Sequence, residues 1–302
     1  MNNPVLKGSL LVALGASSYG MLTTFVKMAY AEGFTSYEIT FAQMILGLFG
    51  LIIINLVFVK RKKNEATEPA EPKLRSILKL MAAGTSLGLT SIFYYFAVRY
   101  IPVSIGIVML MQSVWIGVVL EAIIARKKPS KNKIIAVFAI LGGTVLATNL
   151  FLNSIQLDWR GIAWGFLAAL SYTVTIYASN TVATQLHSFR RSLWMMVGGT
   201  IIVSIISIPF LLEQFNLEIF QKWGLILALF GTILPPILFT VGMPKINVGL
   251  GAIISSIELP VAVLMAYILL NEVVNFQQWI GIVIILMAVV VMNVPRFNRS
   301  LK

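Results

Sequence analysis

Residues 249–270 read GLGAIISSIELPVAVLMAYILL, an apolar run long enough to cross a lipid bilayer as one helix. A spanning helix needs about 20 apolar residues at a rise of 1.5 Å each, so Glu258 lies near the membrane midplane. A carboxylate at that depth costs a few kcal/mol unless it faces a cavity, has a partner or carries a proton. We therefore expect Glu258 to belong to a functional site. The alternative is a protonated carboxyl group that only holds a neighbouring helix.

The composition sets the class of the protein. Of its 302 residues 58% are hydrophobic and 11% are charged, against about 25% charged in a typical soluble domain. We predict an all-α, polytopic membrane protein with no separate soluble domain. The chain has no cysteine and one histidine, which argues against disulfides, thiolate chemistry, a metal site and a bound cofactor.

Hydropathy predicts ten spanning helices. They cover residues 8–29, 37–59, 76–98, 103–125, 133–151, 160–182, 192–212, 223–243, 248–270 and 277–294. The net charge of +12 comes mainly from Lys and Arg in alternate connectors, while the other connectors hold only Arg99, Arg160 and Lys222. This asymmetry predicts that both termini are cytoplasmic, and it makes nucleic acid an unexpected partner.

The chain repeats itself. Residues 101–106 (IPVSIG) align with 246–251 (INVGLG), and residues 14–20 (LGASSYG) align with 167–173 (LAALSYT). We predict two five-helix repeats, residues 1–151 and 152–302, around a central cavity. Because five is odd, the halves enter the membrane in opposite directions, as in the inverted repeats of secondary transporters. Two fused halves make a monomer sufficient.

The same register predicts which residues face Glu258. Its counterpart in the fourth helix is Ser113, with Gln112 beside it, and Pro260 corresponds to Trp115. We expect a midplane pocket with Glu258 from one half and Gln112, Ser113 and Trp115 from the other. Substrate sites of inverted-repeat transporters lie at this depth, where the halves meet.

Other candidate lining residues are polar or aromatic: Tyr19, Tyr94, Tyr172, Thr175, Ser179 and Ser255. Tyr19 and Tyr172 lie well inside their spans, away from the interfacial belts. Of the adjacent Tyr94 and Tyr95, at most one is expected to face the cavity. Helix packing is the alternative reading for the small residues beside them. An aromatic wall beside a carboxylate suits an amphipathic or cationic ligand. Glu121, near a helix end, is expected to be a solvated interfacial charge, and Lys27 to extend outward to water.

The motifs SSIELPV (255–261), LLNEV (269–273) and QQWIGI (277–282), on ten helices in two halves, resemble the drug/metabolite transporter superfamily. Within it, the chain is most similar to EamA-type exporters, and the similarity covers nearly the whole chain. The fourth helix departs from the family pattern, with Trp115 and later Lys127 where Pro and Glu are common. The resemblance implies a basket-like bundle that exports metabolites, such as amino acids or nucleoside-like compounds, by alternating access.

These observations favour a secondary exporter of small zwitterionic or amphipathic metabolites in the bacterial cytoplasmic (inner) membrane. Its partners are the bilayer, a small-molecule substrate and protons exchanged through Glu258. One alternative is a proton antiporter of lipophilic cations, which resembles small multidrug resistance proteins with their single membrane Glu. Another is a non-transporting sensor or scaffold. No metalloprotease motif or nucleophile with a histidine base supports an enzyme.

Overall fold

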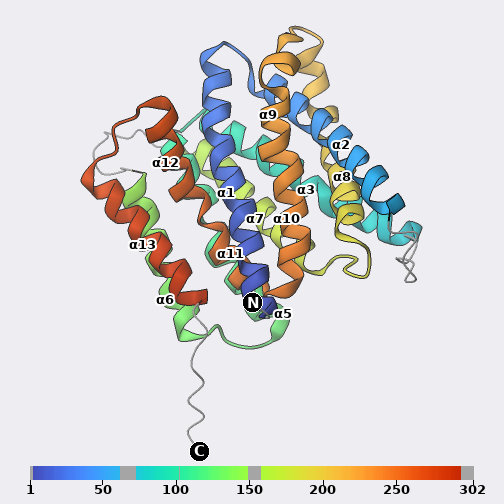
Figure 1. Cartoon of the computed structure of the whole chain (residues 1–302). Helices are drawn as coiled ribbons and strands as arrows, with labels where there is room; N and C mark the ends of the chain where they lie inside the picture. The colour runs from blue at the N-terminus through green and yellow to red at the C-terminus, as the bar shows by residue number, and fades with distance from the viewer. Residues whose placement is uncertain (1–2, 62–72, 102, 149–157, 294–302) are drawn as a thin grey trace, which may run out of the picture.

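In the computed structural model, the described residues are 3–61, 73–101, 103–148 and 158–293, and their only regular elements are helices (Figure 1). Helical structure is expected here because a bilayer offers no partners to backbone N–H and C=O groups, and a helix satisfies them internally. Many large apolar side chains remain exposed on the outer surface of the bundle. Examples are Leu14, Ile53, Phe138, Leu225 and Val290.

The first half runs from α1 to α6. Its elements are α1 (Pro4–Ala31), α2 (Ser36–Arg61), α3 (Leu74–Val98), α4 (Val103–Leu110), α5 (Ser113–Ala125) and α6 (Lys131–Ala147). Asn3 caps α1, because its side-chain oxygen accepts the N–H of Val5 at 3.0 Å. Thr35 and Glu38 form a capping box at the start of α2, in which the Glu38 carboxylate accepts the Thr35 N–H at 2.7 Å.

The second half repeats this order. It contains α7 (Trp159–Thr181) and α8 (Ser188–Leu211). A rod follows that is made of η3 (Phe220–Gly224), α9 (Leu225–Ala228), η4 (Leu229–Ile233), α10 (Leu234–Gly242) and η5 (Met243–Lys245). The last elements are α11 (Val248–Ser255), α12 (Glu258–Leu270) and α13 (Phe276–Asn293). The wide π-helical turn η4 precedes Pro235 and Pro236, whose missing N–H groups leave two upstream carbonyls without their α-helical donors.

Eight helical segments of the described chain are long and apolar enough to cross a membrane, and they correspond to predicted spans one to four and six to nine. The fifth and tenth predicted spans fall on α6, of 17 residues, and α13, whose apolar part is Phe276–Met292. These two helices pack closely on each other, since a Cβ on Gly281 would lie 2.5 Å from the Gly143 carbonyl oxygen. Ten membrane crossings therefore stay a prediction.

The first helix of each half packs on helices of the other half. Helix α1 packs on α10 and α12, while its counterpart α7 packs on α3 and α4. Helix α5 packs on α11. Helix α6 packs on its counterpart α13, and α2 packs on its counterpart α8, so corresponding helices also meet each other. The start of α7 lies against the end of α3, where a Cβ on Gly161 would contact Ile101. Helices α1 and α7 therefore begin at opposite ends of the bundle.

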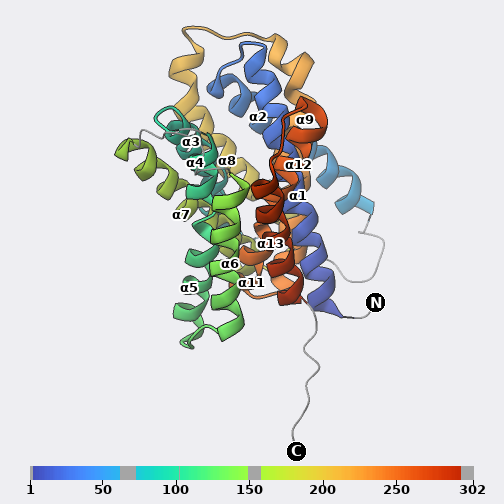
Figure 2. The same cartoon turned by 90° about the vertical axis from the view of Figure 1, so that its left-hand side faces the viewer.

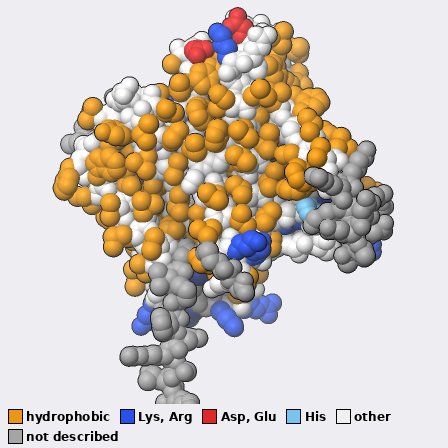
Figure 3. Space-filling view, viewed as in Figure 1, with side chains coloured by type: hydrophobic (Ala, Val, Ile, Leu, Met, Phe, Trp, Pro, Cys, Tyr) orange, Lys and Arg blue, Asp and Glu red, His pale blue; other side chains and the backbone are white. Residues whose placement is uncertain are grey.

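Helix α1 begins and α13 ends at the same end of the bundle, called here the terminal face (Figures 1 and 2). The other end is called the opposite face. Hydrophobic side chains cover the middle of the surface in Figure 3, with Lys and Arg gathered toward the terminal face. Glu and a few cations lie at the opposite face. A broad apolar band between two charged ends is what a bilayer requires.

Candidate solute cavity

A cavity of about 1020 Å³, its open mouth included, lies between the two halves. Eight segments contribute to its wall: α1, α2, α3, α4, α7, α8, η4 and α12. The wall is mainly apolar with aromatic and hydroxyl groups. Its residues are Tyr19, Leu22, Thr23, Val26, Gln43, Met44, Leu87, Thr90, Ser91, Tyr94, Tyr95, Ile107, Leu110, Met111, Tyr172, Thr175, Met196, Gly231, Thr232, Glu258, Leu259 and Ala262. Glu258 is the only charged side chain among them.

The cavity lies toward the opposite face. On α1 its lining begins at Tyr19 and continues to Val26, in the half of the helix away from the terminal face. Below Tyr19, α1 contributes Val12 and Ala16 to a large buried cluster that also contains Phe239 and Met243. This packed cluster separates the cavity from the terminal face.

Glu258 stands at the first residue of α12, beside two tyrosines. The Tyr172 hydroxyl donates a hydrogen bond to Glu258 Oε2 at 3.2 Å. The Tyr19 ring meets Tyr172 edge-on, with 6.3 Å between ring centroids. Helix α1 approaches the backbone here, because a Cβ on Gly20 would lie only 2.4 Å from the Glu258 carbonyl oxygen. The tyrosines thus orient the carboxylate at the meeting point of α1, α7 and α12.

Pro260 explains why α11 ends and α12 begins at this depth. Proline has no N–H to donate to the Ser256 carbonyl, and its ring crowds the preceding turn. The Leu259 N–H instead reaches Ser256 at 3.2 Å, as part of a tighter turn. The interruption places Glu258 at the start of a helical segment.

The matching interruption between α4 and α5 contains no proline. It occurs at Gln112, whose side chain bonds to the backbone of its own helix. The Gln112 backbone N–H donates to the Met109 carbonyl at 3.1 Å and not to the Val108 carbonyl, as it would in an α-helix. The Gln112 side-chain Nε2 donates to the Val108 carbonyl instead, at 2.9 Å. Trp115 Nε1 donates to Gln112 Oε1 at 2.9 Å. Gln112, Ser113 and Trp115 do not line the cavity; Leu110 and Met111 of the same region do.

The structure brings five predicted residues together on the cavity wall: Tyr19, Tyr94, Tyr172, Thr175 and Glu258. Two others lie behind the wall. Ser255 donates to the Gly251 carbonyl at 2.9 Å, and Ser179 is 1% exposed. Whether these residues bind a solute stays a prediction.

Tyr94 and Tyr95 both line the cavity, although at most one of them was expected to do so. Several other lining residues were not predicted, including Gln43, Thr90, Ser91 and Thr232. Gln43 carried a usable signal, because it is a polar side chain inside an apolar span, as Glu258 is. Thr90 and Thr232 carried little, since threonine is common in spanning helices and bonds to its own backbone. Thr90 donates to Ser86 at 2.7 Å in this way.

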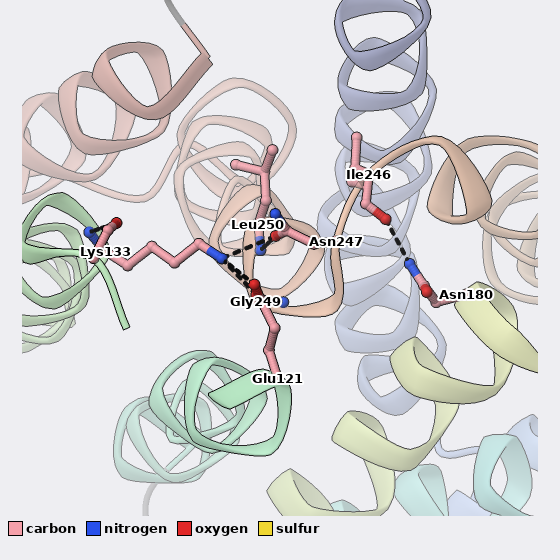
Figure 4. A network of polar contacts seen from close by, with 8 residues as sticks. Glu121, Lys133, Asn180, Ile246, Asn247, Gly249 and Leu250 are labelled. Carbon is pink, nitrogen blue, oxygen red and sulfur yellow. Dashed lines mark hydrogen bonds and ion pairs between the residues drawn. The ribbon is translucent and has the colours of Figure 1, made fainter. Parts of the chain in front are cut away.

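At the terminal face a polar network joins the two halves (Figure 4). Lys133 on α6 contacts both carboxylate oxygens of Glu121 on α5 and donates to Asn247 Oδ1 at 3.0 Å. Glu121 Oε2 also accepts the Gly249 N–H at 2.8 Å, while Asn247 accepts the Leu250 N–H at 2.9 Å. The two side chains thereby satisfy orphan donors at the start of α11.

The network corrects the expectation for Glu121. The side chains of Glu121 and Lys133 are 23% and 12% exposed, so the carboxylate is a largely buried partner and not a solvated interfacial charge. The sequence did not indicate this contact. Glu121 lies near Arg126 and Lys127 along the chain, but its carboxylate bonds to Lys133 on the next helix and to Gly249 in the other half.

A buried guanidinium group and a partly buried amide connect segments of the second half near the same face. Arg191 is 1% exposed and donates to four carbonyls, those of Val182, Thr240, Ala178 and Ser179, at 2.8–3.3 Å. Asn180 donates to the Met243 and Ile246 carbonyls at 2.6 and 2.8 Å; the bond to Ile246 is drawn in Figure 4.

At the opposite face, the two halves are connected by a more exposed ion pair. Lys27 pairs with Glu272 at 2.8 Å, but the two side chains are 40% and 47% exposed. Lys27 therefore does reach outward, as expected. A second pocket at this face contains Tyr30, Phe34 and Arg99, and it shares Tyr95 with the cavity. Tyr95 packs edge-on against Tyr30, with 6.4 Å between centroids.

The EamA-like transporter family model matches the chain twice, over residues 6–149 and 159–294. The chain belongs to the EamA-like transporter family. The protein is thus an integral multi-pass membrane protein of a family that transports small solutes, as the sequence motifs indicated. The two matches cover both halves of the bundle, including every segment that lines the cavity.

The fold of this EamA-like protein is similar to that of a protein of known crystal structure, whose sequence is 13% identical. The similarity has a TM-score of 0.75 and covers 94% of this chain and 96% of the other. At that identity the likeness concerns the fold alone. No curated protein matches the sequence significantly.

Proposed function

We propose that this protein is a secondary transporter that exports small amine-bearing metabolites, such as amino acids and similar zwitterionic or amphipathic solutes. Export takes place across the bacterial cytoplasmic membrane, with both termini in the cytoplasm, and a monomer carries it out. The observation that carries the proposal is a single carboxylate, Glu258, in a largely apolar cavity between the two halves. An ammonium group is the natural partner of a carboxylate in such surroundings.

Proton coupling follows from competition at one group. The Glu258 carboxyl group holds either a proton or the substrate ammonium, because a neutral carboxylic acid has lost the charge that attracts the amine. Substrate binding on one side of the membrane then releases a proton, and proton binding on the other side releases substrate. Tyr172 donates a hydrogen bond to Glu258 Oε2 and so holds the carboxyl group in place on the cavity wall.

Alternating access is supported by the arrangement of the two halves. The cavity lies toward the opposite face, while the packed cluster and the Glu121–Lys133 network close the terminal face. Corresponding helices exchange partners between the halves, so an equivalent arrangement can close the other end. We propose ten spans in two inverted repeats for this motion, with α6 and α13 as the two short ones.

The test is transport by the Glu258→Gln variant in reconstituted vesicles. We expect uptake of amino acids driven by a pH gradient to fall to the background level, with the detergent-purified protein still folded. Glu218→Gln is the matched control, since Glu218 is an exposed carboxylate outside the cavity, and its transport should stay normal. Normal, pH-dependent transport by Glu258→Gln would remove this carboxylate from the mechanism.

A proton antiporter of lipophilic cations is the second candidate. The four tyrosines on the wall and the lack of Lys or Arg among the described lining residues favour it. Thermal stabilisation of the purified protein separates the two functions. Stabilisation by amino acids supports the metabolite exporter, whereas stabilisation by lipophilic cations alone, growing with pH, supports the antiporter. A sensor or scaffold would move neither class across vesicles.

A further inference from the structure

The amide of Gln43 is a polar group of the cavity that has no partner in the described part of the chain. Gln43 lies on α2, in the first half, and it is 4% exposed. Its side chain makes no hydrogen bond within the described part of the chain, although it lines the cavity. The Gln43 amide is not among the fully buried, unpartnered polar atoms of the described chain, so it faces the cavity, where a solute can bond to it.

The surroundings hold this amide in place. The Thr232 hydroxyl on η4 donates to the Gln43 backbone carbonyl at 2.9 Å, which fixes α2 against η4. Gly231, the preceding residue, leaves the space that the side chain occupies. A Cβ there would lie 2.5 Å from Gln43 Nε2 and 2.9 Å from Cδ. The site is therefore a slot built around the carboxamide.

Most other polar groups of the wall already have a partner. Thr23, Thr90, Thr175 and Thr232 each donate to a backbone carbonyl. Tyr172 donates to Glu258. The Gln43 carboxamide, by contrast, keeps two donors and an acceptor for a solute, and it carries no charge. It therefore suits a carboxylate or carbonyl oxygen, which the carboxylate of Glu258 would repel or leave unpaired.

We propose that Gln43 binds the second polar group of the transported amine, a carboxylate or carbonyl, and thereby selects amino acids and their amides over simple amines. This inference rests on the proposed function, in which Glu258 binds the amine. Gln43 belongs to the first half and Glu258 to the second, so a solute held by both contacts both halves. A site built to hydrogen-bond a substrate group rejects the analogue that lacks it.

The experiment uses three ligands that share a ring and an amine: phenylalanine, phenylalaninamide and phenethylamine, which has neither carboxyl nor amide. The ring suits the tyrosines of the wall. Binding is measured by calorimetry on the full-length, detergent-purified protein. Wild type should bind phenylalanine and phenylalaninamide about tenfold more tightly than phenethylamine.

Gln43→Leu should reduce the affinity for phenylalanine and phenylalaninamide to that for phenethylamine, whose own affinity stays unchanged. Gly231→Ala provides an independent variant that leaves residue 43 intact, because its methyl group would meet the Gln43 amide at 2.5 Å and Leu22 Cδ2 at 2.8 Å and so displace the amide. It should show the same selective loss. Gln185→Leu is the control: this exposed glutamine lies outside the cavity and contacts Ser76, so all three affinities should be retained.

The outcomes separate this inference from the proposed function. If Gln43→Leu weakens all three ligands equally, or none, the inference is wrong while the role of Glu258 stands. If Glu258→Gln leaves phenethylamine binding intact, the amine site is misassigned and the proposed function fails. If wild type binds none of the three, the substrate class is wrong and both fall together.

Discussion

Two contacts join the halves of this protein at opposite ends, and they differ in how deeply they are buried. At the terminal face, Glu121 and Lys133 are largely buried and share their bonds with Asn247 and Gly249. At the opposite face, Lys27 and Glu272 form one exposed pair. Exposed ion pairs are worth about 0–1 kcal/mol, whereas removing one partner of a buried pair costs several.

The difference matches the position of the cavity. The loosely joined end is the one toward which the cavity extends, and the tightly joined end is closed by packed side chains. A transporter that opens at one end needs a contact there that separates easily. The comparison therefore predicts unequal effects of mutations that remove similar charges.

The largest effect is expected at Glu121. Glu121→Ala leaves the Lys133 ammonium without its carboxylate and the Gly249 N–H without an acceptor. We expect the free energy of unfolding to fall by about 3–5 kcal/mol, measured by denaturant titration in detergent. The double variant Glu121→Gln with Lys133→Met, which removes both charges, should lose less. A double variant as unstable as Glu121→Ala would contradict a buried charge pair.

A smaller effect is expected at Gly249. A methyl group there would lie 2.4 Å from Glu121 Oε2 and 3.2 Å from Val118 Cα, so α5 and α11 must separate. Gly249→Ala should destabilise the protein by about 1–3 kcal/mol in thermal or chemical unfolding. Gly142→Ala is the matched control, because a Cβ there meets nothing within 4 Å. Equal behaviour of the two variants would mean that the close approach is unimportant.

The contrast between the two faces also predicts from which side of the membrane the cavity can be reached. The chain has no cysteine, so Ser91→Cys places a single thiol on the cavity wall. A membrane-impermeant thiol reagent should label it from the side of the opposite face. Adding Glu121→Gln and Lys133→Met should increase labelling from the terminal face about fivefold, which corresponds to about 1 kcal/mol. Unchanged labelling from both sides would show that the network does not control access.

The smallest effect is expected at the exposed pair. Lys27→Ala or Glu272→Ala should change the free energy of unfolding by less than about 1 kcal/mol, and high salt should abolish the difference. The same unfolding titration, run at low and high salt, measures this. A loss as large as that of Glu121→Ala would remove the contrast between the two faces.

The position of a residue along its helical segment was predictable from the sequence. The run around Glu258 gave its position by counting, and the repeat register paired it with Ser113, which begins α5 as Glu258 begins α12. The direction in which a side chain points around its helix axis was not predictable. Gln112 sits at a suitable depth, but its amide is used within its own helix, and Trp115 takes the remaining oxygen.

By itself the sequence determined the class of fold, the placement of the long apolar helices, the repeat and the mid-span carboxylate. Each of these follows from periodicity and length along one chain, which the bilayer turns into geometry. Only the tertiary structure decided which polar groups meet. The contact of Glu121 with Gly249, and the space over Gly231 that the Gln43 side chain occupies, depend on how helices distant in sequence rotate and pack against one another.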